Sequence, residues 1–376
     1  MGRQIMKIRI VHMLYSFGLG GLEGMIAGLI NRMDRSIFSH SICVFCDELA
    51  SLKKIDPGIA VDVHVIKRHF SHDPSVVIRL SGVLMKIRPD IVRTYNWAGM
   101  EGIVAAKLCG LRNIVHSEHG FDISEIYKQK KRRIAARRLL LKNCVKVIAV
   151  SKGLQRWLVE DVKVDSDKVA YIPNGCDISE FYPGKDAEVR RKLGIREDDI
   201  VVGTVGSLVE LKDQKSLIEA FGRLAGPRNN IKLMLVGDGP MRNELERLSR
   251  AAGVKEKTIF TGRVTGPASF YRAMDIFALP SLSENMPNVL LQAMATGLPV
   301  IATDVGDVGH ILDGEERGII VKPKDIDAME QGIKLFLDHP ELGKDMGSAA
   351  RKRIEEAFDI GRIKNAYEKL YESIME

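Results

Sequence analysis

The sequence has few cysteines and no long apolar run, and both absences restrict the class of protein. Five cysteines in 376 residues, an odd number, with no secretory signal at the N-terminus indicate a reducing compartment. The apolar segment IRIVHML (8–14) is too short for a membrane-spanning helix or for the core of a signal peptide. A myristoylation signal is excluded because the sixth residue is neither Ser nor Thr. We therefore expect a cytoplasmic protein without a membrane span.

Metal and nucleic-acid motifs are also missing. No cluster of His, Cys, Asp or Glu has the spacing of a metal site, so we expect no metal. Cys43 and Cys46 form a CxxC, but they lie in a predicted strand and would point to opposite faces, which favours packing over redox chemistry. Aromatic residues do not alternate with basic ones as in a nucleic-acid module, so we expect no nucleic-acid partner.

The net charge of +7 is concentrated in one segment. Between Lys128 and Lys142 there are eight basic residues and no acid, with apolar residues beside them. Helical spacing would give this segment a basic face and an apolar face. One interpretation is a solvated helix packed on its own domain. The other is contact with an anionic membrane surface, at the inner face of the cell membrane, or with a phosphorylated acceptor. The residues predicted to make that contact are Arg132, Arg133, Arg137 and Arg138.

Short apolar runs alternate with helical patterns, which predicts parallel sheets covered by helices on both faces. The predicted strands are 7–14, 41–46, 61–66, 90–95, 113–118, 146–151, 168–173, 199–206, 231–237, 257–263, 275–280, 299–304 and 318–323. The pattern pauses at Pro183 and Gly184 and then restarts. We therefore predict an α/β protein with two doubly wound Rossmann-like domains facing a cleft, residues 1–184 and 185–357. A C-terminal helix, 358–376, is predicted to pack back on the first domain.

Two glycine-rich loops follow predicted strands but depart from the dinucleotide-binding fingerprint. In YSFGLGGLEGM (15–25) the third glycine position holds Glu23, and in LVGDGPMRNEL (235–245) it holds Arg242. Large side chains there oppose the close packing of helix on strand that the fingerprint requires, which argues against a dehydrogenase. Both loops still bring backbone N–H groups to helix starts, where an anion can bind.

The stretch SENMPNVLLQAMATGLPVIA (283–302) combines an acid, a helix and a polar amide. Pro287 suits the first helical turn and Gly297 suits a helix stop. A diphosphate at the helix start would meet free amides and the positive end of the helix dipole. Glu284 could then reach a sugar on one side and Gln292 a ribose on the other, which is the order of groups in a nucleotide-sugar. Taken alone, the stretch fits a capped core helix with a solvent-facing Gln better than a nucleotide-sugar site.

Several motifs occur in the order and spacing of one family. They are GGLE (20–23), SEHG (117–120), VSKGL (150–154), IPNGCDISEFYP (172–183), VGSLVELKDQ (205–214), VGDGP (236–240) and LPSLSENMPNVLLQAMATGLPVIAT (279–303). With them, the chain resembles the family 4 retaining glycosyltransferases, which have the GT-B fold, over essentially its whole length. PDIVRTYNWAGMEGIVAAKLCG (89–110) followed by SEHGFD resembles the subgroup associated with exopolysaccharide and PEP-CTERM systems.

The resemblance implies an acceptor-binding first domain, a donor-binding second domain and three catalytic residues. Lys212 matches the lysine on the donor diphosphate, His119 the histidine near the reaction centre, and Glu284 the first acid of a paired-acid motif that contacts the donor sugar. The predicted donor-binding residues are Gly20, Gly21, Ser207, Lys212, Gly237, Glu284, Asn285, Met286, Pro287, Asn288 and Gln292. The implied reaction is a metal-independent, retaining hexosyl transfer without a cofactor. It would move a sugar from a nucleotide-sugar to a hydroxyl of a saccharide or lipid-linked saccharide.

Four positions depart from the family pattern. Gln292 replaces the second acid, Ser207 stands where an arginine is common, Asn285 replaces a glycine, and GDVGH (306–310) replaces a Gly-Gly-x-Pro-Glu motif. A ribose diol can still bond to an amide, at a cost on the order of 1 kcal/mol. Loss of the arginine leaves more of the diphosphate charge to Lys212. The alternatives are therefore a weakened or silent GT-B binding protein and a GT-B sugar-nucleotide epimerase. The sequence identifies neither sugar, base nor acceptor.

Overall fold

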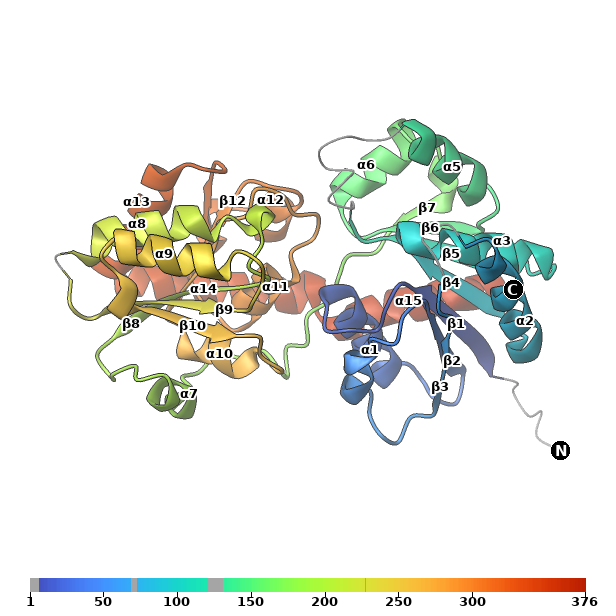
Figure 1. Ribbon diagram of the computed structural model, residues 1–376, viewed down its shortest axis with the longest axis horizontal. Coiled ribbons are helices and arrows are strands. Elements are labelled where there is room, and N and C mark those ends of the chain that lie inside the picture. The colour runs from blue at the N-terminus through green and yellow to red at the C-terminus, as the bar shows by residue number, and fades with distance from the viewer. Residues whose placement is uncertain (1–6, 69–72, 121–130, 227) are drawn as a thin grey trace. The chain divides into compact units, whose positions relative to one another are not determined.

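The computed structural model describes residues 7–68, 73–120, 131–226 and 228–376. The chain forms two compact units (Figure 1). The first comprises Met1–Asn174 together with Ile360–Glu376, and the second comprises Gly175–Asp359. Each unit is built on one parallel sheet, and each is described separately below.

The first unit contains a seven-stranded sheet in the order β3-β2-β1-β4-β5-β6-β7. Its strands are β1 (Ile8–Leu14), β2 (Phe38–Val44), β3 (Val61–Val65), β4 (Ile91–Tyr95), β5 (Ile114–Glu118), β6 (Lys146–Ala149) and β7 (Val169–Tyr171). All neighbouring strands pair in parallel. The chain order reverses between β1 and β4, where ligands of such sheets usually bind beyond the carboxyl ends of the strands.

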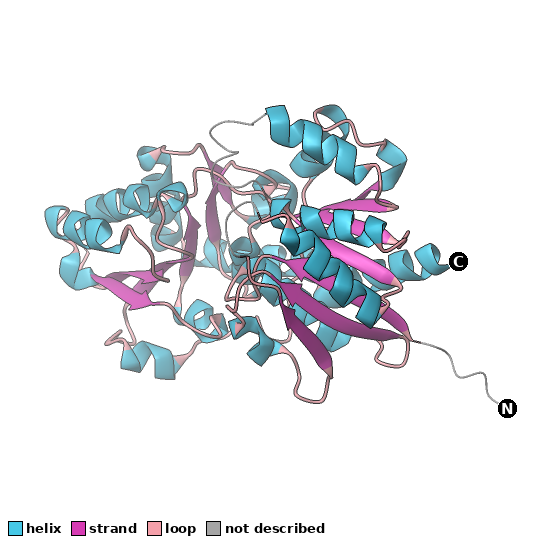
Figure 2. Cartoon of the chain, turned by 45° about the vertical axis from the view of Figure 1, so that its right-hand side comes forward, coloured by secondary structure: helices cyan, strands magenta, loops and turns pink. Residues whose placement is uncertain are grey.

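Helices cover both faces of this sheet (Figure 2). They are α1 (Gly21–Arg32), α2 (Ser75–Ile87), α3 (Met100–Leu108), α5 (Lys131–Leu141), α6 (Lys152–Glu160) and α15 (Ile360–Met375). On one face, Ile26 and Ile30 of α1 join Ile363 and Tyr367 of α15 in a core with the strands. Gly102 of α3 lies against the other face, because a Cβ there would meet the Met13 side chain.

A buried arginine ties α15 to the sheet. Arg93 of β4 is fully buried, and its guanidinium donates hydrogen bonds to Ser117 Oγ (2.6 Å) and to the Tyr371 hydroxyl. It also lies 4.8 Å from the ring centroids of both Tyr95 and Tyr367. A cation in an apolar core is costly without such partners. The two tyrosines of α15 thus make the C-terminal helix an integral part of the first unit.

The second unit contains a six-stranded parallel sheet in the order β10-β9-β8-β11-β12-β13. Its strands are β8 (Ile200–Val205), β9 (Ile231–Val236), β10 (Thr258–Gly262), β11 (Ile276–Leu279), β12 (Val300–Thr303) and β13 (Ile319–Val321). The chain order reverses between the neighbouring strands β8 and β11. By the same rule, the loops that follow these two strands are the expected ligand-binding position of this unit.

Two helical layers cover this second sheet. The helices are α7 (Ala187–Lys192), α8 (Gln214–Ala225), α9 (Arg242–Ala251), α10 (Ala268–Ala273), α11 (Asn288–Ala295), α12 (Val308–Leu312), α13 (Ile326–Asp338) and α14 (Pro340–Arg353), followed by a π-helical turn (Ile354–Phe358). Phe221 of α8 and Ile333 of α13 pack on one face in a common core with Val202 and Ile301. On the other face, α11 packs against α14.

The predicted strands and their parallel pairing are confirmed, with one shift. The predicted strand 41–46 runs from Phe38 to Val44, because the β-bonded register with β1 begins at the Ile8–Phe38 pair. Cys43 is buried, and burial raises the pKa of its thiol to about 12, while Cys46 lies beyond the strand. Neither forms a disulfide.

The second unit begins earlier in the chain than residue 184, where the sequence pattern pauses. The Cys176 amide donates to the Phe358 carbonyl (2.8 Å). The Arg351 guanidinium donates to the Phe181 carbonyl (2.6 Å). The segment before the pause is therefore bonded to the end of the second unit, although its sequence continues the pattern of the first.

Candidate functional site

The loops after β8 and β11 bring a lysine and an acid together at the strand-order reversal of the second sheet. Lys212 ends a short 3₁₀ turn (Glu210–Lys212), and Glu284 follows β11. Lys212 Nζ lies 2.5 Å from Glu284 Oε1, with the lysine side chain 27% exposed and the acid 10% exposed. The amide of Leu282 donates to the carbonyl of Leu211 (2.8 Å), which joins the two loops through their backbones. The two residues predicted to hold donor diphosphate and donor sugar thus form one ion pair.

Only one oxygen of the Glu284 carboxylate is used in this arrangement. Ser281 Oγ donates to Oε1 (2.7 Å), the same atom that accepts from Lys212. The Ser281 carbonyl in turn accepts from Thr303 Oγ1 (2.6 Å), at the end of β12. The other oxygen, Oε2, accepts no hydrogen bond from any residue that the structure describes. A carboxylate held by one oxygen can accept a substrate hydroxyl with the other.

A glycine holds the loop that carries Glu284. Gly306 has φ +56°, and a Cβ on it would lie 2.3 Å from the Glu284 carbonyl oxygen, so a side chain is excluded. The next amide, that of Asp307, donates to the Asn285 carbonyl (3.0 Å). The altered motif at 306–310 therefore keeps the glycine that this close backbone approach requires.

Helix α11 starts one residue later than the sequence predicts, with Pro287 as its N-cap. Met286 is buried and fixes the loop before the helix, while Asn288 is half-buried at its first position. Gln292 is half-buried, and its Oε1 accepts a hydrogen bond from the hydroxyl of Tyr271 (2.9 Å). Its NH2 group donates no hydrogen bond to the described part of the chain. The predicted ribose-binding amide is therefore anchored at one end and available at the other.

Ser207 and Gly237 lie where the loops after β8 and β9 approach each other. Ser207 is exposed, and its carbonyl accepts from Gln214 Nε2 (3.1 Å) at the start of α8. Gly237 has φ +141°, and a Cβ on it would lie 2.0 Å from the Gly206 carbonyl oxygen. Glycine is thus required at 237 for backbone contact, whatever its relation to a ligand.

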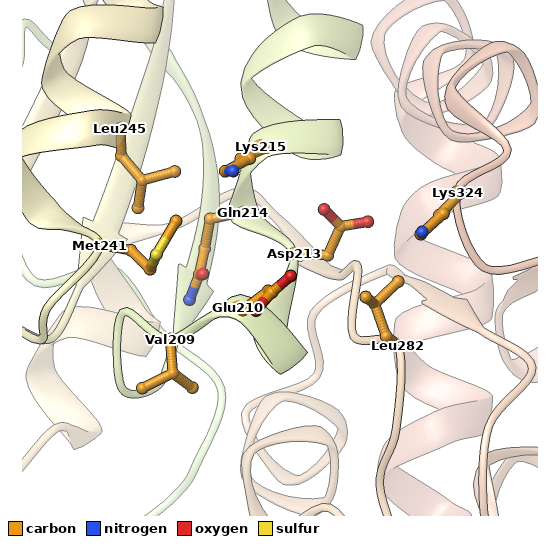
Figure 3. Close-up of a pocket in the computed structure, with 9 residues that line it drawn as sticks. All are labelled: Val209, Glu210, Asp213, Gln214, Lys215, Met241, Leu245, Leu282 and Lys324. Carbon is orange, nitrogen blue, oxygen red and sulfur yellow. The ribbon is translucent and has the colours of Figure 1, made fainter. Parts of the chain in front are cut away.

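A cavity of about 160 Å³ opens beside these loops at the start of α8 (Figure 3). It is lined by Val209, Glu210, Asp213, Gln214, Lys215, Met241, Leu245, Leu282 and Lys324. Figure 3 shows the Asp213 carboxylate between Lys215 on one side and Lys324 on the other. None of these residues was among the predicted site residues, although most of them lie in the motifs quoted above, such as VGSLVELKDQ (205–214).

In the first unit, His119 follows β5 at the carboxyl edge of the sheet. Its amide donates to Asn96 Oδ1 (2.7 Å), and its ring lies 5.7 Å from that of Tyr95. Burial lowers the pKa of His119 to about 3, helped by the charge of Arg93, whereas the Asn174 side chain acts in the opposite direction. The imidazole is therefore neutral at physiological pH, so it can act as a hydrogen-bonding group but not as a cation.

The Gly20–Gly21 turn leads into α1, as the sequence predicts. A Cβ on Gly20 would lie 2.1 Å from Glu23 Oε2, so the carboxylate of the first helical turn folds over the loop. Burial raises the pKa of Glu23, and the nearby charge of Glu48 acts in the same direction. The residue that breaks the dinucleotide fingerprint thus occupies the space over the turn.

The basic segment differs from the prediction of a basic face beside an apolar one. Residues 128–130 lie outside the described residues, and residues 131–141 form α5. Arg137 is buried, where its Nε donates to Glu118 Oε1 (2.8 Å) and its guanidinium lies 5.1 Å from the ring centroids of Trp97 and Trp157. The prediction that Arg137 contacts a membrane or acceptor is therefore wrong. The buried carboxylate of Glu118 and the two aromatic rings stabilise this cation inside the first unit.

The other three arginines of the segment differ in their surroundings. Arg132 is exposed. Arg133 is half-buried and lies 4.9 Å from the ring centroid of Trp97. Arg138 Nε donates to the Val162 carbonyl (2.9 Å) while much of the residue stays exposed. Long apolar side chains also remain on the surface here, since Leu139 is 67% exposed.

Within the described residues, no helix is long and apolar enough to cross a membrane. The same residues contain no group of three or more His, Cys, Asp or Glu side chains that could hold a metal ion.

Two doubly wound parallel units, with a lysine–acid pair at the strand-order reversal of the second, define a protein of the GT-B fold. The family described as Glycosyl transferases group 1 matches residues 185–353, and Glycosyltransferase Family 4 matches residues 19–180. The chain belongs to these glycosyltransferases.

Curated relatives and solved structures agree with this assignment. An uncharacterized glycosyltransferase of Methanocaldococcus jannaschii is 30% identical over 78% of each chain. The UDP-Gal:alpha-D-GlcNAc-diphosphoundecaprenol alpha-1,3-galactosyltransferase of Escherichia coli is 27% identical over 97% of each chain. Among solved structures, Anabaena HepE in complex with UDP-glucose has a TM-score of 0.84 and 20% identity, covering 97% of this chain and 99% of its own.

Proposed function

We propose that the protein transfers a hexose from a nucleotide-sugar to an acceptor hydroxyl, with the donor held in the second unit. The observation that carries the proposal is the Lys212–Glu284 pair, fixed at the strand-order reversal where such sheets bind ligands. UDP-glucose bound to Anabaena HepE, which has the same fold, supports a donor of this class. In this proposal the donor diphosphate separates Lys212 from Glu284 on binding.

The chain's own residues can then stabilise the developing charge. The ammonium of Lys212 would face the diphosphate, where negative charge grows as the glycosidic bond breaks. The backbone N–H groups at the start of α11 would add the positive end of the helix dipole on the side of the diphosphate. Glu284 Oε2 would accept a sugar hydroxyl, while Ser281 keeps the carboxylate in place. We propose that these groups act without a metal ion. We also propose that the acceptor hydroxyl attacks the sugar on the same face from which the diphosphate leaves, so that the configuration is retained.

The departures at Gln292 and Ser207 are compatible with donor binding. Gln292 offers an NH2 group to the ribose, because Tyr271 bonds to its Oε1. Ser207 supplies no cation, so the diphosphate charge depends more on Lys212 than it would beside an arginine. We therefore favour a working transferase over a silent binding protein, since the lysine, the first acid and the serine that supports it are all in bonded positions.

For the acceptor, we propose a saccharide or lipid-linked saccharide of an exopolysaccharide or cell-envelope glycan. The name of the Escherichia coli relative, a galactosyltransferase acting on a diphosphoundecaprenol-linked sugar, supports a lipid-linked acceptor.

We also propose peripheral attachment to an anionic membrane surface through the exposed part of α5. Charge reversal by Arg132→Glu should lower co-sedimentation with anionic vesicles, because exposed basic residues contribute on the order of 1 kcal/mol each near such a surface. Lys352→Glu, at an exposed position of α14 in the second unit, serves as the control for net charge. Equal sedimentation of wild type and Arg132→Glu would remove α5 from the proposed attachment.

A panel of donors tests the proposed function. Thermal unfolding is measured with UDP-glucose, UDP-galactose, GDP-mannose and ADP-glucose, and turnover is followed by release of the nucleoside diphosphate. A donor at 100 times its Kd should stabilise the protein by about 2.7 kcal/mol, which raises Tm by several degrees. The proposal is contradicted if no nucleotide-sugar of the panel raises Tm and none is turned over.

A further inference from the structure

Asn96, directly after β4, adopts a backbone conformation that few residues other than glycine can take. Its dihedral angles are φ +50° and ψ −169°. An L-residue in this region carries strain of about 1–3 kcal/mol and persists only where its surroundings impose the conformation. Asn96 lies in the segment 89–110 quoted above but is not among the predicted site residues.

The surrounding bonds account for the conformation. The Asn96 amide donates to the Ser117 carbonyl (2.9 Å), and its own carbonyl accepts from the Gly99 amide (3.2 Å). A Cβ on Gly99 would lie 3.1 Å from the Met13 carbonyl oxygen, so the turn after Asn96 packs closely on the sheet. The chain is therefore forced to leave β4 by this path.

The backbone path alone would favour glycine, so the Asn side chain needs a separate explanation. Glycine has no Cβ and adopts a positive φ at little cost. Among the described residues the side chain makes one hydrogen bond, in which Oδ1 accepts from the His119 amide (2.7 Å). A backbone N–H can only donate, so this contact orients the Asn96 side chain with its Oδ1 toward His119. The strained residue thus provides the bond that sets how the chain continues from β5 into His119.

We propose that Asn96 is a positioning residue for His119. It fixes the His119 backbone and, through it, the orientation of the neutral imidazole that packs on Tyr95. This inference rests on the proposed sugar transfer and on the catalytic role that the family resemblance implies for His119. It assigns Asn96 no contact with substrate. A displacement of a catalytic group by about 1 Å can cost up to two orders of magnitude in rate.

Asn96→Gly tests the proposal without threatening the fold, because glycine accepts the same dihedral angles and removes only the side chain. Asn96→Asp keeps an oxygen that can accept from the His119 amide. Arg88→Gly is the matched control, because Arg88 also has a positive φ (+50°) in the first unit, is exposed, and precedes β4 at the opposite end of the strand. All three are compared with wild type in the full chain, using a donor of the panel that wild type turns over.

We expect Asn96→Gly to lower kcat at least 10-fold with the donor KM changed less than 2-fold and an unchanged or higher Tm. Asn96→Asp should keep kcat within about 3-fold, and Arg88→Gly should match wild type. Wild-type kcat in Asn96→Gly, or an equal loss in Arg88→Gly, would overturn the assignment of Asn96 while leaving sugar transfer intact. Absence of wild-type turnover with every donor would instead overturn the proposed function, and this inference with it.

Discussion

Replacing Lys212 by Ala should lower kcat for sugar transfer by about 100- to 1000-fold. The estimate follows from the loss of one preorganised positive group opposite charge that develops in the transition state. Ser207 stands where the family commonly has an arginine, so no guanidinium at that position can compensate. The measurement is steady-state release of nucleoside diphosphate with a donor that raises Tm in the wild type.

Controls separate this catalytic loss from damage to the fold. Lys192→Ala removes an exposed lysine of the second unit that pairs with Glu188 (2.6 Å) outside the cavity lining, and it should keep nearly full turnover. Lys212→Ala also leaves the Glu284 carboxylate with Ser281 as its remaining described partner. The double variant Lys212→Ala, Glu284→Gln removes that isolated charge and should restore Tm but not turnover. Turnover by Lys212→Ala within a few-fold of wild type would remove the lysine from the donor site.

Acidification from pH 7 to pH 5 should strongly destabilise the first unit. Burial lowers the pKa of His40 to about 4 and that of His119 to about 3, and lowers the pKa of His12 well below its ordinary value. His12 Nε2 lies 3.1 Å from His40 Nδ1, and its Nδ1 lies 2.7 Å from the Tyr95 hydroxyl. These histidines are therefore neutral in the folded protein at neutral pH.

The sign of the effect follows from proton binding in the two states. In the unfolded chain each histidine takes up a proton as the pH falls through about 6.5. In the folded protein His40 does so only near pH 4 and His119 only near pH 3, and the pKa of His12 is also lowered. The folded first unit therefore keeps its full stability above pH 6.5. Its free energy of unfolding decreases as the pH falls from there toward the pKa of each histidine in the folded state. Between pH 7 and pH 5 the loss is about 2 kcal/mol for each of His40 and His119, or about 4 kcal/mol for the two. His12 adds a loss of the same sign. A loss of this size is a large part of the stability of many domains.

Tryptophan fluorescence reports this transition selectively, because both tryptophans, Trp97 and Trp157, lie in the first unit. Urea unfolding of the full chain at pH 7, 6 and 5 should give a steadily falling free energy of unfolding. His40→Gln should lose about 2 kcal/mol less than wild type over this range. His339→Gln, at an exposed position of the second unit, should leave the fluorescence-detected pH dependence unchanged. An unfolding free energy that is constant from pH 7 to pH 5 would contradict the burial of neutral histidines.

Much of the fold was predictable from the sequence because parallel strands leave a strong local pattern. Runs such as IKLMLVG and PVIATD, bounded by glycine, proline or acid, locate β9 and β12 to within a residue or so. The position of Glu284 was equally predictable, because an acid just after a strand and before a helix lies at the ligand-binding edge of such a sheet. These inferences need only neighbouring residues and the rule for parallel topology.

The contacts that support the site were not predictable in this way, because each joins residues far apart in the chain. Arg137 reads as a surface cation until Glu118 and two tryptophans are placed around it. Tyr271 anchors Gln292 from a different helix. Asn96 reads as an ordinary turn residue, and its strain appears only in the backbone dihedral angles. Among these residues, only Glu118 could have been noticed in the sequence. It is an acid within a predicted buried strand, and a buried carboxylate requires a cationic partner.

The most direct test of the account is a crystal structure with a nucleotide-sugar that raises Tm. The account predicts the diphosphate beside Lys212 Nζ, at the start of α11, with a donor-sugar hydroxyl on Glu284 Oε2 and the Lys212–Glu284 pair opened. A donor bound elsewhere, with that ion pair intact at 2.5 Å, would contradict it.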